Sequence, residues 1–161
     1  MTQSHSINIG IDPGGSSGCI AVINDMVTPS ECTFFEFSKK PTERDLVLFA
    51  QTWRPYSKVM GIRCVMEKVH AMPKQGVVSS FSFGENNGKC KMFAEIVQAE
   101  THMVTPRTWQ KAIGLVVVKG ESKVEHKNRL RQIAERLYPH IKFTNPKVDA
   151  LLMAHYAKNL I

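Results

Sequence analysis

The sequence has no run of about 18 apolar residues, so none of its segments is long enough to cross a membrane as a helix. Its first six residues, MTQSHS, are mostly polar, and they lack the basic and then apolar layout of a secretory signal. From these two absences we expect a cytoplasmic protein without a membrane partner.

Cysteine is scarce, and no two cysteines stand close together in the chain. Cys19, Cys32, Cys64 and Cys90 lie among apolar neighbours and form no CxxC pair. A zinc ribbon or a dithiol redox site is built on such pairs, so the pattern favours buried free thiols in a reducing compartment instead. Internal repeats, low-complexity tracts and linkers are absent as well. At 161 residues, the chain suits a single domain over residues 1–161.

Acidic residues are outnumbered by basic ones. The sequence has 21 Lys and Arg against 14 Asp and Glu, a formal net charge of +7. Such an excess indicates a polyanionic partner, with nucleic acid favoured over an anionic membrane surface. Basic residues gather in the segment TPRTWQK, residues 105–111, and again at Lys119, Lys123, Lys127, Arg129, Arg131 and Arg136. A solvated helix face would explain the second group, but the net charge favours phosphate contacts.

Hydrophobic periodicity predicts a mixed α/β layer fold. Residues 6–12 alternate between isoleucine and small or polar residues, the period of a strand. Strands are predicted over residues 6–12, 19–24, 31–37, 63–69 and 102–104. Helices are predicted over residues 41–53, 78–99, 106–113, 121–138 and 146–160. The second helix carries Ser80, Gly84 and Gly88 four residues apart. Because each glycine costs a helix about 1 kcal/mol relative to alanine, we expect a close-packed partner there.

Three carboxylates stand where the pattern otherwise favours apolar side chains. Asp12 ends the first strand before a glycine-rich turn, Glu67 lies in the fourth strand, and Asp149 interrupts an apolar helix. Burying all three is costly unless water or a cation neutralises them together. Mg²⁺ prefers oxygen ligands and keeps several waters, so these residues are its candidate ligands. Structural interpretations stay open: a turn cap for the first, a Lys or Arg partner for the second, and a helix-dipole contact for the third.

These motifs, in this order, resemble those of the RuvC-type Holliday junction resolvases, which have an RNase H-like fold. IGIDPG at residues 9–14 resembles their first strand, VMEKV at 65–69 their second acidic motif, and DALL at 149–152 their C-terminal acidic helix. TPRTWQK at 105–111 and KVEHK at 123–127 are similar to the phage-encoded branch. The resemblance runs along nearly the whole chain.

The resemblance implies a crossover junction endodeoxyribonuclease, a structure-selective enzyme that nicks four-way DNA junctions symmetrically as a homodimer. Asp12, Glu67 and Asp149 would hold Mg²⁺ or Mn²⁺, with two ions per site. The fold would be a five-stranded mixed sheet with an antiparallel second strand and helices on both faces. The helix at 78–99 would form the dimer contact, and a phage protein would act in the cytoplasm of a bacterial host. Residues expected to hold DNA phosphates are Lys68, Lys74, Arg107, Lys111, Lys119, Lys123 and Lys127.

The chain departs from the family at the expected fourth carboxylate. The family usually has an acid three or four residues before the last one, and this chain has Asn145. We count Asn145 with the catalytic residues, either as a weak neutral ligand or as an inactivating substitution of Asp. It also fits as a helix N-cap before Pro146. His155 is an alternative ligand.

A second departure concerns the aromatic wedge that often follows the second acidic motif in the family. His70 takes that place in this chain. Phe81 and Phe83 are further candidates for separating bases at the crossover, although phenylalanines at this spacing also serve as packing residues.

Two other functions stay open. The turn DPGGSSG at residues 12–18 also resembles the phosphate-binding turn of the actin and sugar-kinase superfamily, whose members bind ATP between two lobes. This chain is too short for two lobes and has no second glycine-rich turn, so we expect no nucleotide cofactor. The other alternative is a catalytically impaired protein that binds junctions without cutting them, which Asn145 keeps open.

Overall fold

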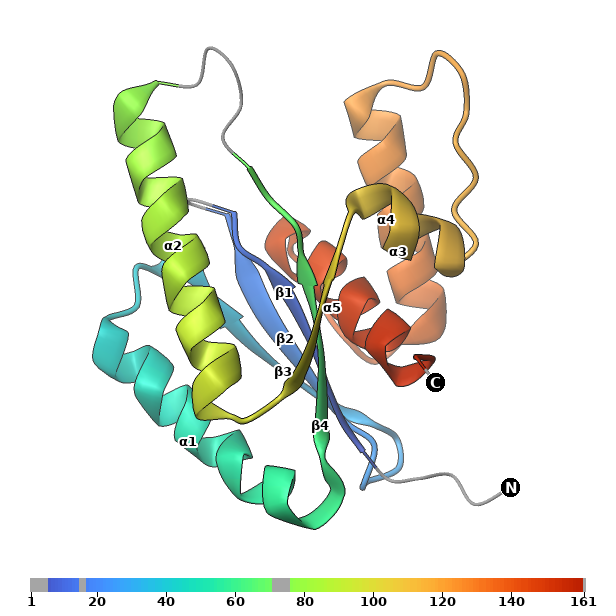
Figure 1. The fold of residues 1–161 in the computed structure, drawn as a ribbon. Coiled ribbons are helices and arrows are strands. Elements are labelled where there is room, and N and C mark those ends of the chain that lie inside the picture. Colours follow the sequence, from blue (N-terminus) through green and yellow to red (C-terminus); the bar gives the residue numbers. More distant parts are fainter. Residues whose placement is uncertain (1–5, 15–16, 71–75, 161) are drawn as a thin grey trace.

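The computed structural model describes residues 6–14, 17–70 and 76–160. Its centre is a five-stranded sheet with the strand order β3-β2-β1-β4-β5 (Figure 1). The strands are β1 (Ile7–Asp12), β2 (Cys19–Asn24), β3 (Glu31–Glu36), β4 (Ile62–Glu67) and β5 (Glu100–Val104). β2 is antiparallel to both of its neighbours, whereas β1, β4 and β5 are parallel. The predicted mixed sheet with an antiparallel second strand is confirmed.

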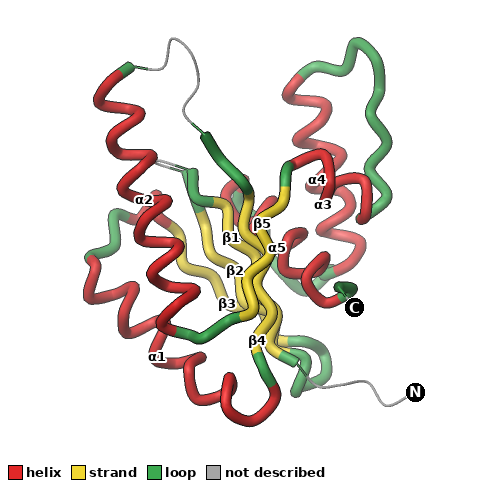
Figure 2. Tube along the Cα trace, in the orientation of Figure 1, coloured by secondary structure: helices red, strands yellow, loops and turns green. Residues whose placement is uncertain are grey.

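Helices cover both faces of the sheet (Figure 2). One face carries α1 (Glu43–Met60) and α2 (Val77–Ile96), and a 3-10 turn, Phe37–Lys39, leads into this layer. The other face carries α3 (Pro106–Ala112), α4 (Lys123–Leu137) and α5 (Asn145–Lys158). Among the described helices, none is both long and apolar enough to span a membrane. All five predicted helices are therefore present, in two layers.

The alternation within β1 divides its side chains between two cores. Ile7, Ile9 and Ile11 are fully buried in the core formed with α1 and α2. The alternate residues of the strand point to the opposite face, where the core is formed mainly by α5 with α3 and α4. The four cysteines are free; three of them are fully buried in these cores as predicted, whereas Cys32 is half-buried.

α5 lies directly on β1 because residue 10 has no side chain. A Cβ atom at Gly10 would lie 1.9 Å from the carbonyl oxygen of Ala150 and 2.3 Å from the backbone nitrogen of Ala154. Glycine within a strand is typical of such close backbone approaches. The contact sets the height of α5 above the sheet, and with it the position of the first turns of this helix.

A buried carboxylate fixes the start of α5. Glu36, at the end of β3, accepts a hydrogen bond of 3.1 Å from the hydroxyl of Thr144, the residue before the helix. The ammonium groups of Lys39 and Lys147 lie 3.0 and 3.6 Å from the other Glu36 oxygen. Hydrogen bonding and these charges outweigh the effect of burial and lower the pKa of Glu36.

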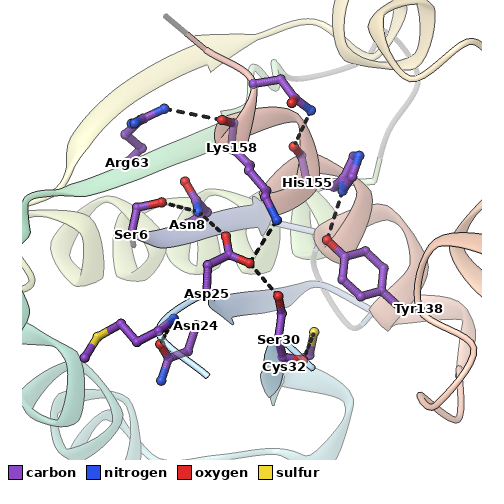
Figure 3. A network of polar contacts seen from close by, with 12 residues as sticks. Ser6, Asn8, Asn24, Asp25, Ser30, Cys32, Arg63, Tyr138, His155 and Lys158 are labelled. Atoms are coloured by element: carbon purple, nitrogen blue, oxygen red, sulfur yellow. Dashed lines mark hydrogen bonds and ion pairs between the residues drawn. The ribbon is translucent and has the colours of Figure 1, made fainter. Parts of the chain in front are cut away.

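A polar network fixes the other end of α5 (Figure 3). Asp25, just after β2, accepts hydrogen bonds from Lys158 Nζ at 2.9 Å, Ser30 Oγ at 2.5 Å and Asn8 Nδ2 at 3.0 Å. Arg63 of β4 donates to the carbonyl oxygen of Leu160 at 2.7 Å. Because the helix is held at both ends and in the middle, its placement on the sheet is strongly determined.

Several boundaries differ from the prediction. The first helix extends to Met60 instead of residue 53, because Tyr56 and Met60 continue the packing against the core, which compensates for the missing N–H of Pro55. The fourth strand ends at Glu67 instead of residue 69, since β1 pairs with it only as far as Met66. The second helix covers residues 77–96 and the fifth strand begins at 100, two residues earlier than predicted.

Candidate active site

Three elements bring the predicted carboxylates to the carboxyl end of β1. Asp12 ends β1, and Glu67 ends the parallel neighbour β4. The register pairs Ile11 with Met66, so the two strand-end carboxylates follow on adjacent strands and point to the same face. Asp149 lies in the second turn of α5 on that face, next to the residue whose carbonyl contacts Gly10.

Asp12 has a strongly perturbed carboxyl. Burial raises the pKa of Asp12 from 3.8 to about 7, and the charges of Asp149 and Glu67 add to this effect. The backbone N–H of Gly14 donates to Oδ1 of Asp12 at 3.2 Å, so the interpretation as a turn cap also holds. A capping role alone does not explain why Asp12 lies close enough to Asp149 and Glu67 for their charges to act on it.

Glu67 is bound by a neutral donor. Its Oε2 atom accepts a hydrogen bond of 3.2 Å from the indole N–H of Trp109, which lies in α3 and is fully buried. Burial raises the pKa of Glu67, and the Trp109 hydrogen bond opposes that rise. The sequence suggested a Lys or Arg partner here, but the hydrogen-bond donor in the structure is an indole.

Lys127 of α4 is the cation that faces the three carboxylates. Its ammonium forms an ion pair with Oδ2 of Asp149 at 2.5 Å. Burial would lower the pKa of Lys127, but the charges of Asp149, Asp12 and Glu67 raise it overall. The other oxygen, Oδ1 of Asp149, is buried and has no hydrogen-bond partner within the described part of the chain. An unpartnered buried carboxylate oxygen is costly, so this position would be stabilised by a further cation.

The chemistry of these residues fits a divalent metal. All three side chains offer oxygen atoms, which Mg²⁺ prefers, and one of these atoms, Asp149 Oδ1, is buried without a partner. Among the described residues, no group of three or more His, Cys, Asp or Glu side chains is arranged to hold a metal ion as it stands. The charge of Asp149 contributes to the raised pKa of both Asp12 and Glu67, and the Lys127 ammonium provides part of the neutralising charge.

Asn145 is the first residue of α5 and is exposed to solvent. It stands four residues before Asp149, so the two share one face of the helix. The prediction that Asn145 caps the helix is wrong: the N-cap position belongs to Thr144, whose hydroxyl is bound to Glu36. Pro146 is tolerated at the second helical position because the first N–H groups of a helix have no intrahelical partners.

His155, the alternative ligand, is engaged elsewhere. Its Nδ1 atom lies 2.9 Å from the hydroxyl of Tyr138, at the end of α4. Burial, and then the charge of Lys158, lower the pKa of His155. The structure therefore brings His155 to Tyr138 and to the network around Asp25 (Figure 3), at the end of α5 opposite the carboxylates.

The residues predicted to contact DNA are exposed wherever the structure describes them. This set consists of Lys68, His70, Phe81, Arg107, Lys111, Lys119, Lys123 and Lys127, whereas Lys74 lies outside the described residues. Figure 1 shows the start of α2 and the loop between α3 and α4 at the same end of the molecule as the carboxyl ends of β1 and β4. The carboxylates therefore lie at the end where these two segments project.

Both projecting segments also expose apolar side chains. At the start of α2, Val77, Val78 and Phe81 are 86%, 81% and 75% exposed, while Phe83 is half-buried. Nothing described lies within 4 Å of a Cβ atom built at Gly84 or Gly88, so the predicted close-packed partner of this helix is not found in the described part of this chain. The loop before α4 exposes the run 116–118, three valines.

Sequence reasoning missed the roles of Gly10, Trp109 and Lys127 at this site. A signal existed for Gly10, because a glycine stood among the strand residues opposite the isoleucines. The Trp109 contact joins residues 42 apart in the chain, so it could be found only by deciding that β4 and β5 are neighbours. Lys127 was assigned to DNA as one of several helix lysines, and nothing in the pattern distinguished it from them.

No family model matches the sequence, and no curated protein matches it either. Solved structures do. One is Thermus thermophilus RuvC in complex with a Holliday junction substrate, with a TM-score of 0.58 and 15% identity over 94% of this chain and 92% of that one. Another is a Thermus thermophilus RuvC structure, with a TM-score of 0.56 and 14% identity over 93% and 92%. The chain therefore has the RuvC-like, RNase H-like fold predicted from its motifs.

Proposed function

We propose that the protein is a metal-dependent endonuclease that nicks four-way DNA junctions. The observation that carries this proposal is the group of Asp12, Glu67 and Asp149 at the carboxyl end of β1, where burial, together with the charges of Asp149 and Glu67, raises the pKa of Asp12 to about 7. Likeness of fold to a RuvC bound to a Holliday junction supports the choice of substrate. The net charge of +7 and the exposed lysines around the site support a DNA partner.

The three carboxylates would hold Mg²⁺ or Mn²⁺, with Asn145 as a weak neutral ligand on the face of α5 that carries Asp149. Bound there, divalent metal would stabilise charge on the scissile phosphate and activate the attacking water. The protein's own contribution is rigidity: Asp149 is positioned by the backbone contact at Gly10, and Asp12 by its hydrogen bond from Gly14.

Lys127 has two partners in this proposal. In the metal-free protein it pairs with Asp149. Its side chain is 54% exposed, so the ammonium can turn to a DNA phosphate once another cation neutralises the carboxylates. The assignment of Lys127 to DNA is thereby kept, and the lysine would move between two anionic partners.

The finer features of the proposal come from the resemblance of the motifs. They are a homodimer through α2, symmetric paired nicks, and membership of the phage-encoded branch. The exposed apolar start of α2 supports a protein partner for this helix, and a twofold dimer would present two sites to one junction.

A cleavage assay tests the proposal. A labelled four-way junction and a linear duplex of the same sequence are incubated with Mg²⁺, Mn²⁺ or EDTA. We expect paired nicks in the junction only, and only with metal. Asp12→Asn, Glu67→Gln and Asp149→Asn should each abolish the nicks, whereas the control Glu31→Gln, at an exposed acid on β3, should not. Metal-independent cleavage, or cleavage that survives Asp149→Asn, would contradict the proposal.

A second candidate function is junction binding without cleavage. The observation that favours it is the exposed Asn145 in place of a fourth acid, together with the lack of a ready metal group among the described side chains. The same assay separates the two. Selective binding without nicks in either metal would support the second candidate, and cleavage appearing in Asn145→Asp would then identify the missing ligand.

A further inference from the structure

Trp109 is the hydrogen-bond donor to one of the proposed metal ligands. Its Nε1–H donates to Oε2 of Glu67 at 3.2 Å, and its ring is fully buried. We propose that Trp109 is a positioning residue that orients Glu67 and keeps its second oxygen directed to the site. This inference rests on the proposed function, because it concerns how Glu67 is prepared for a metal ion.

The fold explains how the indole reaches this carboxylate. β5 is parallel to β4 and ends at Val104, opposite Glu67 in the register. The backbone N–H of Lys68 donates to the carbonyl oxygen of Val104 at 2.6 Å, which keeps the two strand ends together. α3 begins at Pro106, so Trp109 lies in the first turn after the strand beside Glu67.

The ring of Trp109 is fixed by its packing. It belongs to the core on the α5 face, together with Leu115, Leu130 and Leu151, and all of these residues are buried. A buried aromatic ring held by such neighbours has little freedom to turn. The N–H group therefore has a fixed direction, and Glu67 must adapt to it.

The chemistry of the donor suits this role. An indole N–H donates one hydrogen bond and accepts none, and it stays neutral at any physiological pH. It can therefore fix Oε2 without bringing a positive charge that would repel a metal ion. Lys127 shows the contrast, because its ammonium pairs with Asp149 and competes with any cation for that carboxylate.

The other tryptophan provides a matched control. Trp53 of α1 is also buried, at 5% exposure, but it lies in the core on the opposite face of the sheet. Its Nε1 atom has no hydrogen-bond partner among the described residues. Replacing either tryptophan by phenylalanine removes a buried indole of the same size, yet only Trp109→Phe removes a hydrogen bond to Glu67.

Calorimetric titration of the DNA-free protein with Mg²⁺ compares the two variants. We expect Trp109→Phe to bind Mg²⁺ about 10-fold more weakly than the unmodified protein, the usual effect of losing a partner that orients a ligand. Trp53→Phe should bind as the unmodified protein does. In the background of Glu67→Ala, Trp109→Phe should have no further effect on Mg²⁺ binding. Equal affinities of the two single variants, at temperatures where both are folded, would overturn the proposal.

A second measurement leaves Trp109 in place. The sequence has two tryptophans, so Trp53→Phe makes Trp109 the sole source of indole fluorescence. Adding Mg²⁺ should shift its emission with the same midpoint as the calorimetric titration. Unchanged emission while calorimetry registers binding would overturn the positioning role. Absence of Mg²⁺ binding in the unmodified protein would instead contradict the proposed function, so the two failures are distinguishable.

Discussion

α5 carries an aspartate–lysine ion pair near each end, and the two pairs differ in what surrounds them. Near its end, Lys158 binds Asp25, which also accepts hydrogen bonds from Ser30 and Asn8. Near its start, Lys127 binds Asp149, whose other oxygen is buried without a described partner. The first carboxylate is satisfied by three donors within the protein, and the second is not.

The charged groups around the two ion pairs differ as well. Two further carboxylates, Asp12 and Glu67, lie within electrostatic reach of Lys127 near the start of the helix. At the other end, the buried atom without a partner is the neutral amide oxygen of Asn8. A satisfied polar network fixes structure, whereas a buried carboxylate oxygen without a donor, such as Asp149 Oδ1, favours the binding of a cation. The comparison therefore separates an anchor from a candidate active site on the same helix.

The largest expected effect comes from Gly10→Ala, which displaces the helix that carries both pairs. A methyl group there would lie 1.9 Å from the carbonyl oxygen of Ala150, and only backbone movement can relieve that clash. We expect a loss of about 3 kcal/mol or more of unfolding free energy, measured by urea denaturation. Gly76→Ala is the control, because nothing described surrounds that position and its φ of -61° suits alanine, and it should change stability by less than about 1 kcal/mol.

Replacing the aspartate of each ion pair should have opposite effects: one variant should lose cleavage activity, and the other should lose stability. Asp149→Asn should lower the cleavage rate more than about 100-fold, since even outer partners of metal ligands cost 10–100-fold, and it should not destabilise the metal-free protein. Asp25→Asn should lower the unfolding free energy by about 2 kcal/mol and keep cleavage within a few-fold below the melting temperature. Junction cleavage and thermal melting of both variants test this. A stability loss in Asp149→Asn as large as that in Asp25→Asn would show that both pairs are anchors.

Because Asp12 is buried beside Glu67 and Asp149, the metal-free protein should become less stable as the pH rises. The pKa of Asp12 is about 7 in the folded protein, against an ordinary value of 3.8, so the folded state retains a proton that the unfolded state has lost. Its stabilising contribution is complete below about pH 3.8 and is lost as the pH rises through about 7. We expect a decrease on the order of 1–3 kcal/mol between pH 5 and pH 8.

Comparison with Asp12→Asn isolates this effect from the other acids of the protein. Urea denaturation of both proteins at several pH values, in EDTA, gives the difference directly. The unfolding free energy of Asp12→Asn should rise relative to that of the unmodified protein as the pH rises. Adding Mg²⁺ should remove this difference. Parallel pH profiles of the two proteins would show that burial and the charges of Asp149 and Glu67 do not raise the pKa of Asp12.

The smallest expected effect concerns the two lysines. Lys127→Met removes a cation that competes for Asp149, so Mg²⁺ should bind a few-fold more tightly in calorimetry. The same variant should weaken junction binding and reduce its salt dependence by about one charge. Lys158→Met, at the other end of α5, should change neither quantity. Weaker Mg²⁺ binding in Lys127→Met would show that the lysine organises the carboxylates instead of competing for them.

The sequence allowed the sheet and the three carboxylates to be predicted because both depend on local patterns. Alternating isoleucines mark β1, and an acid at a strand end or within an apolar helix is conspicuous. The cap at Asn145 was predicted wrongly because the hydrogen bond from Thr144 to Glu36, which places Thr144 at the N-cap position, joins segments that are distant in the sequence. The DNA contacts, the dimer through α2 and the single domain over residues 1–161 stay predictions.

Contacts between distant segments could not be predicted in this way. The hydrogen bond from Trp109 to Glu67 requires the order of β4 and β5, and the pair of Lys127 with Asp149 requires the angle between α4 and α5. Neither depends on a periodicity within one segment. The ion pair between Asp25 and Lys158 joins residues 133 apart, and it was likewise invisible in the pattern.

The contact between Gly10 and α5 has a consequence for redesign. The gap between this helix and β1 is set by main-chain atoms on both sides, so it acts as a fixed spacer between the two segments that carry Asp12 and Asp149. We expect side chains elsewhere in the two cores to tolerate exchange for others of similar volume without altering this spacer. The hydrogen atom that Gly10 has in place of a Cβ thus determines how closely α5 approaches β1, and with it the distance between the segments that carry Asp12 and Asp149.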